Sequence, residues 1–395
     1  MRAPHRWRRL RRATACALAV VAAVAMSGCD AAQGGIATQE GIPEEIKLLG
    51  VRDQTGPVAY AGIGGARGGE LAISEINRSG FLGDGVKLTI EEIDTAGSIE
   101  TASAEMAQAT ADRTVHAIMG PTQGQQAATV APMVERAQVP TIFTQAGSDG
   151  VVVNDYTYRA TAPMASYYDL ATEYLADKRL GDVSVLYNAT FPTFAEIGKG
   201  SLPKQAEQHG LDIISSTPVQ STTQDFTTPV RSIAGEDPDA VVMLLTEPQS
   251  VTALTQLRQA GYDGQVMATS VQGGGNLTEA GKHGEGVIYP TDFSPALTSE
   301  KARDFVAAFQ ERFGQKPDVY AAEGYDGMWW LARAIKASGS ASREGIKRGL
   351  QQVAKEGFDG AMGELTFEGN DMRVPGVLVR WNGTSEELVS RGGAS

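Results

Sequence analysis

The chain alternates short β-branched runs with longer amphipathic stretches from residue 46 onward, and this alternation limits its possible folds more than any other feature. Short β-branched runs indicate strands, and apolar residues that recur every three to four positions indicate helices. The first expected strands cover 46–51, 86–94, 115–120 and 140–144, with expected helices at 64–77, 99–111 and 125–137. This order predicts a mostly parallel sheet with helices on both faces.

The alternation then restarts, which is typical of a second domain of the same class. The second set has expected helices at 165–177, 193–209, 226–233 and 248–260, and expected strands at 182–188, 211–219, 240–246, 265–269 and 286–290. Three further helices are expected at 298–313, 319–338 and 342–356, before a closing strand at 374–381. The sequence therefore predicts two α/β domains in tandem.

The first 28 residues have the composition of a secretory signal peptide. A basic segment, MRAPHRWRRLRR, precedes the apolar run ATACALAVVAAVAM, which is too short to span a bilayer comfortably. Ser27-Gly28-Cys29 resembles a lipoprotein box, so Cys29 is the expected lipidated residue, and the polar residues 29–45 are an expected flexible tether. These features predict a lipid anchor on the outer face of the cell membrane. A cytosolic protein with a basic tail is the alternative.

Charge and cysteine content exclude several classes of function. The formal net charge is −13, and residues 1–28 hold six basic residues and no acidic ones. Without them the chain carries 28 basic against 47 acidic residues, so we expect no nucleic-acid partner. The only cysteines are Cys16 and Cys29, which leaves the expected mature body without a disulfide, a thiol nucleophile or a cysteine metal site.

No motif for catalysis is present. The glycine-rich stretch 50–69 has Arg67 where a dinucleotide fingerprint needs its last glycine, and no GxxxxGK[ST] phosphate-binding motif occurs. The turn at 55–57 and the glycines after it are expected to form the lip of a cleft, although such glycines can also allow close packing. No histidine lies at metal-ligand spacing, and no GxSxG motif occurs. We therefore expect no enzymatic activity, no cofactor and no metal.

Several segments together resemble the leucine/isoleucine/valine-binding proteins, the extracytoplasmic solute receptors of ABC importers. They are IKLLGVRDQTGPVAYAG with GGELAISEINRSGFLGDGVKLTIEEIDTAG, HAIMGPTQGQQAATVAPMVERAQVPTIFT, LTQLRQAGYDGQVMAT and VYAAEGYDGMWWLARAI. The resemblance runs from Ile46 to Trp381. It implies the type I periplasmic-binding architecture, in which two doubly wound parallel-sheet lobes are joined by a three-crossover hinge and close over a solute.

The resemblance also implies the boundaries of the two lobes. Lobe one is expected at 46–160 plus 288–365, and lobe two at 161–287 plus 366–390. The three crossovers are expected near Arg159–Pro163, Glu285–Pro290 and Glu364–Asn370. Because ligands of such folds bind outside the carboxyl ends of the strands, the expected site lies between the lobes.

In family members that bind amino acids, hydroxyls and backbone amides hold the ligand carboxylate, while an acid and tyrosines face its ammonium. In lobe one this sequence lacks those side chains: Gly124 stands at the usual serine, Gly147 at the usual threonine and Ala61 at the usual tyrosine. The resemblance places these three in the ligand site, together with their neighbours Tyr60, Gln123, Gln125 and Gln145.

The lobe-two positions depart from the family pattern in the same way. Phe194 and Thr246 stand at the usual tyrosines, and the usual acid falls at Ser270 to Gln272. The expected contacts are therefore Phe191, Phe194, Thr246, Glu247, Ser270 and Gln272, with Tyr325 at the cleft edge. Ordinary loops, or a core position for Tyr325, are the alternatives. Glutamines and aromatic walls favour a neutral or amide-bearing solute over an ammonium without a charge partner.

The resemblance implies binding rather than chemistry. The expected partners are a small-molecule solute (an amino acid, amide or related metabolite), an ABC permease with its ATPase subunits, and the membrane through the lipid at Cys29. The alternative is a receptor of the same fold that senses the solute and signals to a partner.

Overall fold

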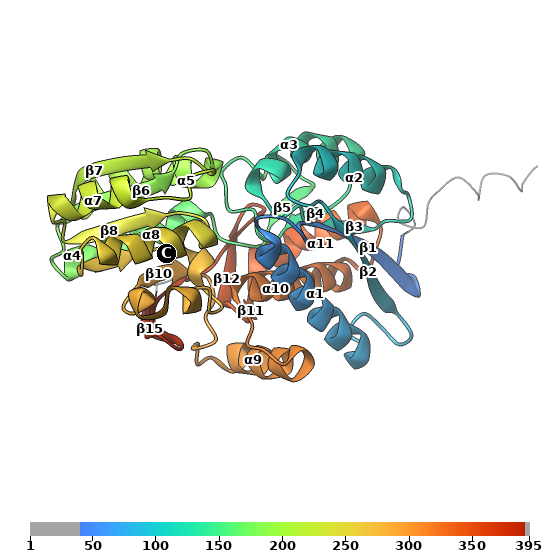
Figure 1. Ribbon diagram of the computed structural model, residues 1–395. Helices are drawn as coiled ribbons and strands as arrows, with labels where there is room; N and C mark the ends of the chain where they lie inside the picture. Colours follow the sequence, from blue (N-terminus) through green and yellow to red (C-terminus); the bar gives the residue numbers. More distant parts are fainter. Residues whose placement is uncertain (1–39, 392–395) are drawn as a thin grey trace, which may run out of the picture.

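The computed structural model describes residues 40–391. The expected signal peptide (1–28), Cys29 and most of the expected tether (29–45) therefore lie outside the described residues. Within 40–391 the chain forms two sheets that lie side by side, each with its own helices (Figure 1). No helix in this range is long and apolar enough to cross a membrane.

The first sheet has eight strands in the order β11-β12-β13-β5-β4-β3-β1-β2. Their bounds are β1 (Glu45–Arg52), β2 (Lys87–Asp94), β3 (Ala117–Met119), β4 (Thr141–Phe143), β5 (Thr157–Arg159), β11 (Phe358–Gly360), β12 (Gly363–Glu368) and β13 (Asp371–Arg373). Strands β1 to β5 pair in parallel, and β11 to β13 pair antiparallel with one another. The order 2-1-3-4-5 of the parallel strands is that of a doubly wound sheet.

The second sheet has seven strands in the order β15-β14-β10-β9-β8-β6-β7. Their bounds are β6 (Asp182–Asn188), β7 (Asp212–Val219), β8 (Ala240–Leu244), β9 (Gln265–Met267), β10 (Ile288–Thr291), β14 (Val377–Trp381) and β15 (Glu386–Arg391). Its five parallel strands, β6 to β10, repeat the 2-1-3-4-5 order. The expected fold class, two doubly wound lobes, is confirmed.

Both faces of each sheet are covered by helices because the strands alternate buried residues to either side. Lobe one carries α1 (Ala59–Ser79), α2 (Ile99–Ala111), α3 (Gly124–Ala137), α9 (Glu300–Phe313), α10 (Val319–Ser338) and α11 (Arg343–Glu356). Lobe two carries α4 (Tyr167–Asp177), α5 (Pro192–Glu196), α6 (Leu202–Gln208), α7 (Thr227–Glu236) and α8 (Glu247–Gln259). Ile46 of β1 packs in one core with α1 and α10, whereas Leu49 packs in another with α2 and α3.

Most glycines of the glycine-rich stretch lie inside a helix rather than in a turn. Helix α1 begins at Ala59, five residues before the expected start, so the glycines after residue 61 are helical. A Cβ at Gly68 would lie 1.8 Å from the carbonyl oxygen of Ala321, and one at Gly324 would lie 2.2 Å from that of Gly65. These glycines therefore allow α1 and α10 to touch backbone to backbone. These helical glycines therefore do not form the cleft lip, whereas the turn at 55–57 lies in the loop between β1 and α1.

The remaining differences concern short or irregular elements. The strands β5, β11, β12, β13 and β15 were not expected from the pattern, and all except β12 and β15 have only three residues. The helix expected over 193–209 is instead α5, a π-helical turn η3 (Ile197–Ser201) and α6. Short 3₁₀ segments η2 (Met164–Ser166), η4 (Ser270–Gln272) and η5 (Thr278–Gly284) complete the chain.

The strand pairing places two of the three crossovers at other positions than expected. Residues 288–291 form β10, which pairs with β9 and β14 and so belongs to the second sheet, not to lobe one. Residues 371–373 form β13, which pairs with β12 and β5 in the first sheet, not in lobe two. The chain therefore changes lobes after β5, after β10 and after β13. The expected positions at 285–290 and 364–370 are too early: the expected strand at 286–290 pairs within the second sheet as β10, and the strands β12 and β13 were not expected.

Candidate functional site

The loops at the carboxyl ends of the two parallel sheets face each other between the lobes. In each sheet the strand order reverses, between β1 and β3 in lobe one and between β6 and β8 in lobe two. Ligands of open α/β sheets bind outside the carboxyl ends of the strands at such reversals. We call the loops after β1, β3 and β4, and those after β6, β8 and β9, the interlobe site.

Asp53, directly after β1, ties the lobe-one loops together. Its fully buried carboxylate accepts hydrogen bonds from Gln123 Nε2 (2.8 Å), from Gln126 Nε2 (2.9 Å) and from the hydroxyl of Thr95. Gln123 Oε1 in turn accepts from Gln125 Nε2 at 3.1 Å. The side chains of Gln123 and Gln125, both expected to contact the solute, are therefore engaged with other residues of lobe one.

At the start of α3, a serine from the next loop fills the space left by a glycine. A Cβ at Gly124 would lie 2.1 Å from Ser148 Oγ. The same Oγ lies 2.5 Å from Thr193 Oγ1 of lobe two, and both residues are buried. Ser148 thus brings a hydroxyl to the position where the family pattern expects one from residue 124. It also makes a direct contact between the lobes, which the sequence did not indicate.

Gln145 and Tyr60 are packed against the N-terminal ends of α1 and α10. Gln145 fits there because Gly65 has no side chain, whose Cβ would lie 2.5 Å from Gln145 Nε2. Gln145 Nε2 donates to the carbonyl oxygen of Tyr320 (3.4 Å), and its Oε1 accepts from Thr144 Oγ1 (2.5 Å). The rings of Tyr60 and Tyr320 lie 5.6 Å apart. Both expected residues are thus held in lobe one.

Across the site, charge from lobe two reaches Tyr60. Burial and the negative charge of Glu247 raise the pKa of the Tyr60 hydroxyl above its usual value. Burial and repulsion from Glu279 raise the pKa of the half-buried Glu247 carboxyl.

The remaining two expected residues of lobe one offer no side-chain polar group to a solute. Ala61, beside Tyr60, is buried. The backbone carbonyl of Gly147 accepts from Met164 N (3.0 Å) at the first crossover.

The lobe-two residues differ in how well their polar groups are satisfied. Phe191 and Phe194 stack with ring centroids 4.8 Å apart, and Thr246 Oγ1 donates to Gln249 Oε1 at 3.2 Å. Ser270 is 4% exposed and Gln272 is fully buried. Neither Oε1 nor Nε2 of Gln272 has a hydrogen-bond partner. Buried polar groups nearly always have one, so Gln272 is the expected site residue best placed to receive a solute.

Tyr325 lies away from the interlobe site. Its hydroxyl donates to Glu75 Oε2 (2.6 Å), and its ring lies 4.7 Å from that of Phe305 and 6.3 Å from that of Trp329. These contacts all belong to α1, α9 and α10 of lobe one. The alternative interpretation of Tyr325 as a packing residue is the one that the geometry supports.

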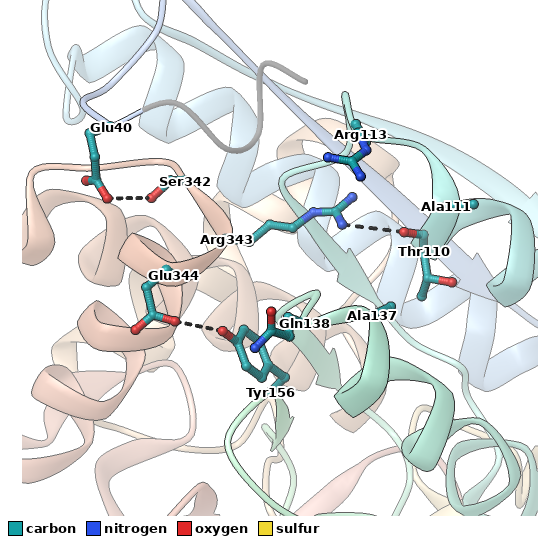
Figure 2. A pocket seen from close by; sticks show the side chains of 10 residues that line it. All are labelled: Glu40, Thr110, Ala111, Arg113, Ala137, Gln138, Tyr156, Ser342, Arg343 and Glu344. Carbon is teal, nitrogen blue, oxygen red and sulfur yellow. Dashed lines mark hydrogen bonds between the residues drawn. The ribbon is translucent and has the colours of Figure 1, made fainter. Parts of the chain in front are cut away.

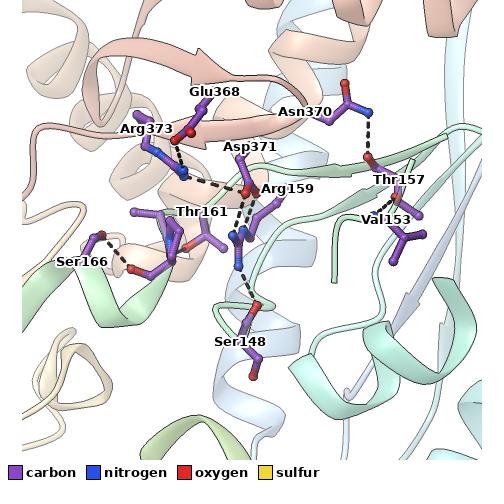
Figure 3. A network of polar contacts seen from close by, with 12 residues as sticks. Ser148, Val153, Thr157, Arg159, Thr161, Ser166, Glu368, Asn370, Asp371 and Arg373 are labelled. Carbon is purple, nitrogen blue, oxygen red and sulfur yellow. Dashed lines mark hydrogen bonds and ion pairs between the residues drawn. The ribbon is translucent and has the colours of Figure 1, made fainter. Parts of the chain in front are cut away.

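Two crossovers of the hinge are joined by an ion pair (Figure 3). Arg159, at the end of β5, donates from Nε to Asp371 Oδ1 (2.7 Å) and from Nη2 to Asp371 Oδ2 (2.9 Å). Its Nη1 donates to the carbonyl oxygen of Ser148 (2.6 Å). The arginine therefore fixes the first and third crossovers and also the loop that carries the interlobe hydroxyl of Ser148.

Two buried acids meet at the hinge, and neither was expected from the sequence. Asp292 follows β10 and Glu323 lies in α10, with 1% and 3% of their surfaces exposed. Thr161 Oγ1 donates to Glu323 Oε1 (2.6 Å) and lies 3.4 Å from Asp292 Oδ2. Burial raises the pKa of Asp292 to about 6 and raises that of Glu323 well above its usual value. An acid within the apolar helix pattern of 319–338 was the available signal for Glu323.

Comparison with known proteins identifies the family. A family model described as periplasmic binding protein matches residues 45–384. The chain belongs to the periplasmic binding protein family. A binding protein from Brucella abortus (strain 2308), the Leu/Ile/Val-binding protein homolog 7, is 24% identical over 367 residues, covering 88% of this chain and 91% of that protein. The resemblance to the leucine/isoleucine/valine-binding proteins is confirmed.

Solved structures of binding proteins share the fold. The leucine-binding protein LivK from Thermotoga maritima MSB8 superposes with a TM-score of 0.81 at 21% identity, covering 88% of this chain and 99% of that one. A solute-binding protein of an ABC transporter from R. palustris, solved with benzoate, superposes with a TM-score of 0.79 at 16% identity, covering 88% and 96%. The type I periplasmic-binding architecture is therefore shown.

A pocket of this binding protein lies in lobe one, at the edge of its sheet that faces away from the interlobe site. This pocket of about 590 Å³ lies near the start of β3, at the amino ends of the strands (Figure 2). Arg343 crosses it and donates from Nη2 to the carbonyl oxygen of Asp112 (2.6 Å) and from Nε to that of Val115 (3.0 Å). Tyr156 donates to Glu344 at 2.7 Å. The bonds of Arg343 join α11 to the segment after α2, and that of Tyr156 joins α11 to the segment before β5. Among residues 40–391 no group of three or more metal ligands occurs.

Proposed function

We propose that this protein is a lipid-anchored, extracytoplasmic solute-binding protein. It captures a small polar solute between its lobes and delivers it to an ABC permease and its ATPase subunits. Membership of the periplasmic binding protein family supports this role, as do relatives named for leucine, isoleucine and valine and a structural neighbour solved with benzoate. The observation that carries the proposal is Gln272, a fully buried amide without a partner at the carboxyl end of β9.

Capture by closure requires contacts that form between the lobes. The hydroxyls of Ser148 and Thr193 meet across the site at 2.5 Å, so the loops of the two lobes can approach closely enough to exclude water from a bound solute. We propose binding and release without chemistry, because the site offers no nucleophile paired with a base.

A thermal-shift screen of the purified protein tests the proposal. The panel contains aliphatic amino acids, amides, urea and aromatic acids, and we expect at least one class to raise the melting temperature in a concentration-dependent way. Gln272→Leu removes both amide atoms at similar size and should weaken binding of that compound by about tenfold or more. The variant should fold as well as the parent, because its buried amide has no partner to lose. Unchanged affinity in Gln272→Leu would contradict the assignment of the site.

The anchor and the transport role need separate tests. Cys29→Ser should release the protein from the cell surface into the soluble extracytoplasmic fraction, because it removes the acceptor for lipid. Uptake of the labelled solute should stop when the gene is deleted and return with the wild-type copy. Normal uptake with a lost transcriptional response would instead support the signalling receptor.

A further inference from the structure

Four buried residues at the hinge end of the interlobe site carry polar atoms without a partner. The atoms are Thr269 Oγ1, Gln272 Nε2 and Oε1, Asp292 Oδ1 and Glu323 Oε2. Each of these residues is at most 3% exposed. Thr269 and Gln272 follow β9, and Asp292 follows the neighbouring strand β10. Buried polar groups of folded proteins nearly always have partners. We therefore expect a bound group at this end of the site to supply the hydrogen bonds that residues 40–391 do not.

The two carboxyl groups are close enough to hold one small group together. A hydroxyl has a single proton, and that of Thr161 goes to Glu323 Oε1 at 2.6 Å, while Asp292 Oδ2 lies 3.4 Å away and accepts from Ala162 N (3.0 Å). The hydroxyl of Tyr167 also hydrogen-bonds to the Asp292 carboxyl. One oxygen of each carboxyl group, Oδ1 of Asp292 and Oε2 of Glu323, nevertheless has no partner. The free oxygens come from opposite sides of the hinge, one from α10 of lobe one and one from the end of β10 in lobe two.

No cation within residues 40–391 forms an ion pair with Asp292 or Glu323. The charge of Arg159 reaches Asp292, but its guanidinium is engaged by Asp371 and by the carbonyl oxygen of Ser148. The other ionisable groups around the pair are Asp318, whose charge opposes a second negative charge at Glu323, and the hydroxyls of Tyr167 and Tyr320. Two buried carboxylates without a cation are strongly unfavourable, so the empty site must hold protons.

We propose that Asp292 and Glu323 form the subsite for a cationic nitrogen of the solute, such as an ammonium or amidinium group. Thr269 and Gln272, on the adjacent strand end, hold the polar group next to that nitrogen. This assignment rests on the proposed function and narrows its solute from neutral or amide-bearing compounds to compounds with a basic nitrogen. The acid that is missing at Ser270 to Gln272 is replaced by two acids from the hinge.

The subsite makes binding depend on pH. A cation that enters between the two carboxyl groups displaces the proton that neutralises them in the empty protein. Since burial raises the pKa of both acids, that proton is present at mildly acidic pH and must be released on binding. Affinity for the cationic solute should therefore increase as the pH rises, with net release of protons.

Matched probes test the subsite in the full chain. Leucine and 3-methylbutylamine carry the nitrogen, 4-methylpentanoate is leucine without it, and benzylamine and benzoate form a second pair. We expect the amine-bearing compound of a pair to bind at least tenfold more tightly than the matched acid, with proton release in calorimetry in two buffers. Asp292→Asn and Glu323→Gln should each lower the affinity for the amine by tenfold or more. They should not weaken binding of the matched acid.

Asp326→Asn is the control, because Asp326 is a fully buried acid one turn along α10 whose oxygens accept from Ala361 N (2.8 Å) and Met362 N (2.9 Å). It should leave the preference for the amine unchanged. Tighter binding of 4-methylpentanoate or benzoate than of the matched amine, or unchanged affinity for the amine in Asp292→Asn and Glu323→Gln, would overturn the subsite alone. Absence of binding by the whole panel would count against the proposed function and the subsite together.

Discussion

The hinge contains two sets of acids, which differ in whether a cation of the chain pairs with them and in how deeply they are buried. Asp371 receives two hydrogen bonds from Arg159, which also holds the loop of Ser148. Asp292 and Glu323 lie beside one threonine hydroxyl, and within residues 40–391 neither forms an ion pair with a cation. The two sets therefore serve two purposes: the paired acid fixes the crossovers, and the more deeply buried, unpaired acids leave a charge for a bound group to neutralise.

Removing Arg159, the cation that pairs with Asp371, should change the unfolding free energy more than any other substitution proposed here. Arg159→Leu leaves Asp371 without its bidentate partner, and breaking such a pair costs about 3 kcal/mol of unfolding free energy, reduced somewhat because the Asp371 side chain is 19% exposed. Urea denaturation of the purified variant measures the loss. The double variant Arg159→Leu with Asp371→Leu is the control, and it should recover part of the stability because no charge remains unpaired. A single variant as stable as the parent would show that the ion pair is not structural.

Replacing the unpaired acids should raise the unfolding free energy rather than lower it. Asp292→Asn and Glu323→Gln keep a side-chain oxygen for Ala162 N and Thr161 Oγ1, respectively, but remove the ionisable group. We expect each to raise the unfolding free energy of the empty protein at pH 8 by about 1–2 kcal/mol, since neither acid has a cation to lose. Loss of stability comparable with that of Arg159→Leu would place both acids in the structural class.

The same contrast predicts the pH dependence of stability. A carboxyl whose pKa is raised from near 4 to about 6 holds its proton more tightly in the folded than in the unfolded protein. The contribution of Asp292 to the unfolding free energy is thus fully present below pH 4 and is lost as the pH rises to about 6 and beyond. Glu323, whose pKa is raised further, extends this loss to higher pH. Melting temperatures across pH 4 to 8 should fall less steeply in the Asp292→Asn, Glu323→Gln double variant. Parallel curves for the parent and the double variant would contradict this assignment.

Most of the fold could be predicted from the sequence, because it rests on periodic patterns. The helices 99–111 and 319–338 have the expected bounds, and the strands of both parallel sheets are where β-branched runs lie. Three-residue strands such as β5 and β13 carry too few residues for a period, and their pairing depends on partners more than 200 positions away. The third crossover was misplaced for the same reason, whereas the second was misplaced because the pairing of the expected strand at 286–290 could not be read from the sequence.

The site was less predictable, since alignment gives positions but not contacts. Gln272 was expected and is buried without a partner, whereas Gln123 was expected and is engaged by Asp53. Ser148 and Asp292 were missed because their importance arises from neighbours supplied by other strands. A side chain's free hydrogen-bonding capacity is a property of the folded chain and cannot be read from the residue type.

The smallest expected effect concerns the interlobe hydrogen bond between Ser148 and Thr193. This contact depends on the ion pair of Arg159 and Asp371, because Arg159 also holds the loop of Ser148. Arg159 holds the carbonyl of Ser148, whose hydroxyl meets Thr193. Ser148→Ala removes one hydrogen bond worth about 1 kcal/mol, which should lower the ratio of closed to open molecules about fivefold while the global stability changes little. Small-angle scattering, or energy transfer between dyes on the two lobes, measures that ratio. Thr193→Val should match Ser148→Ala, and Asp292→Asn should leave this contact intact in the empty protein. An unchanged ratio in both hydroxyl variants would mean that the hinge alone sets the closed geometry.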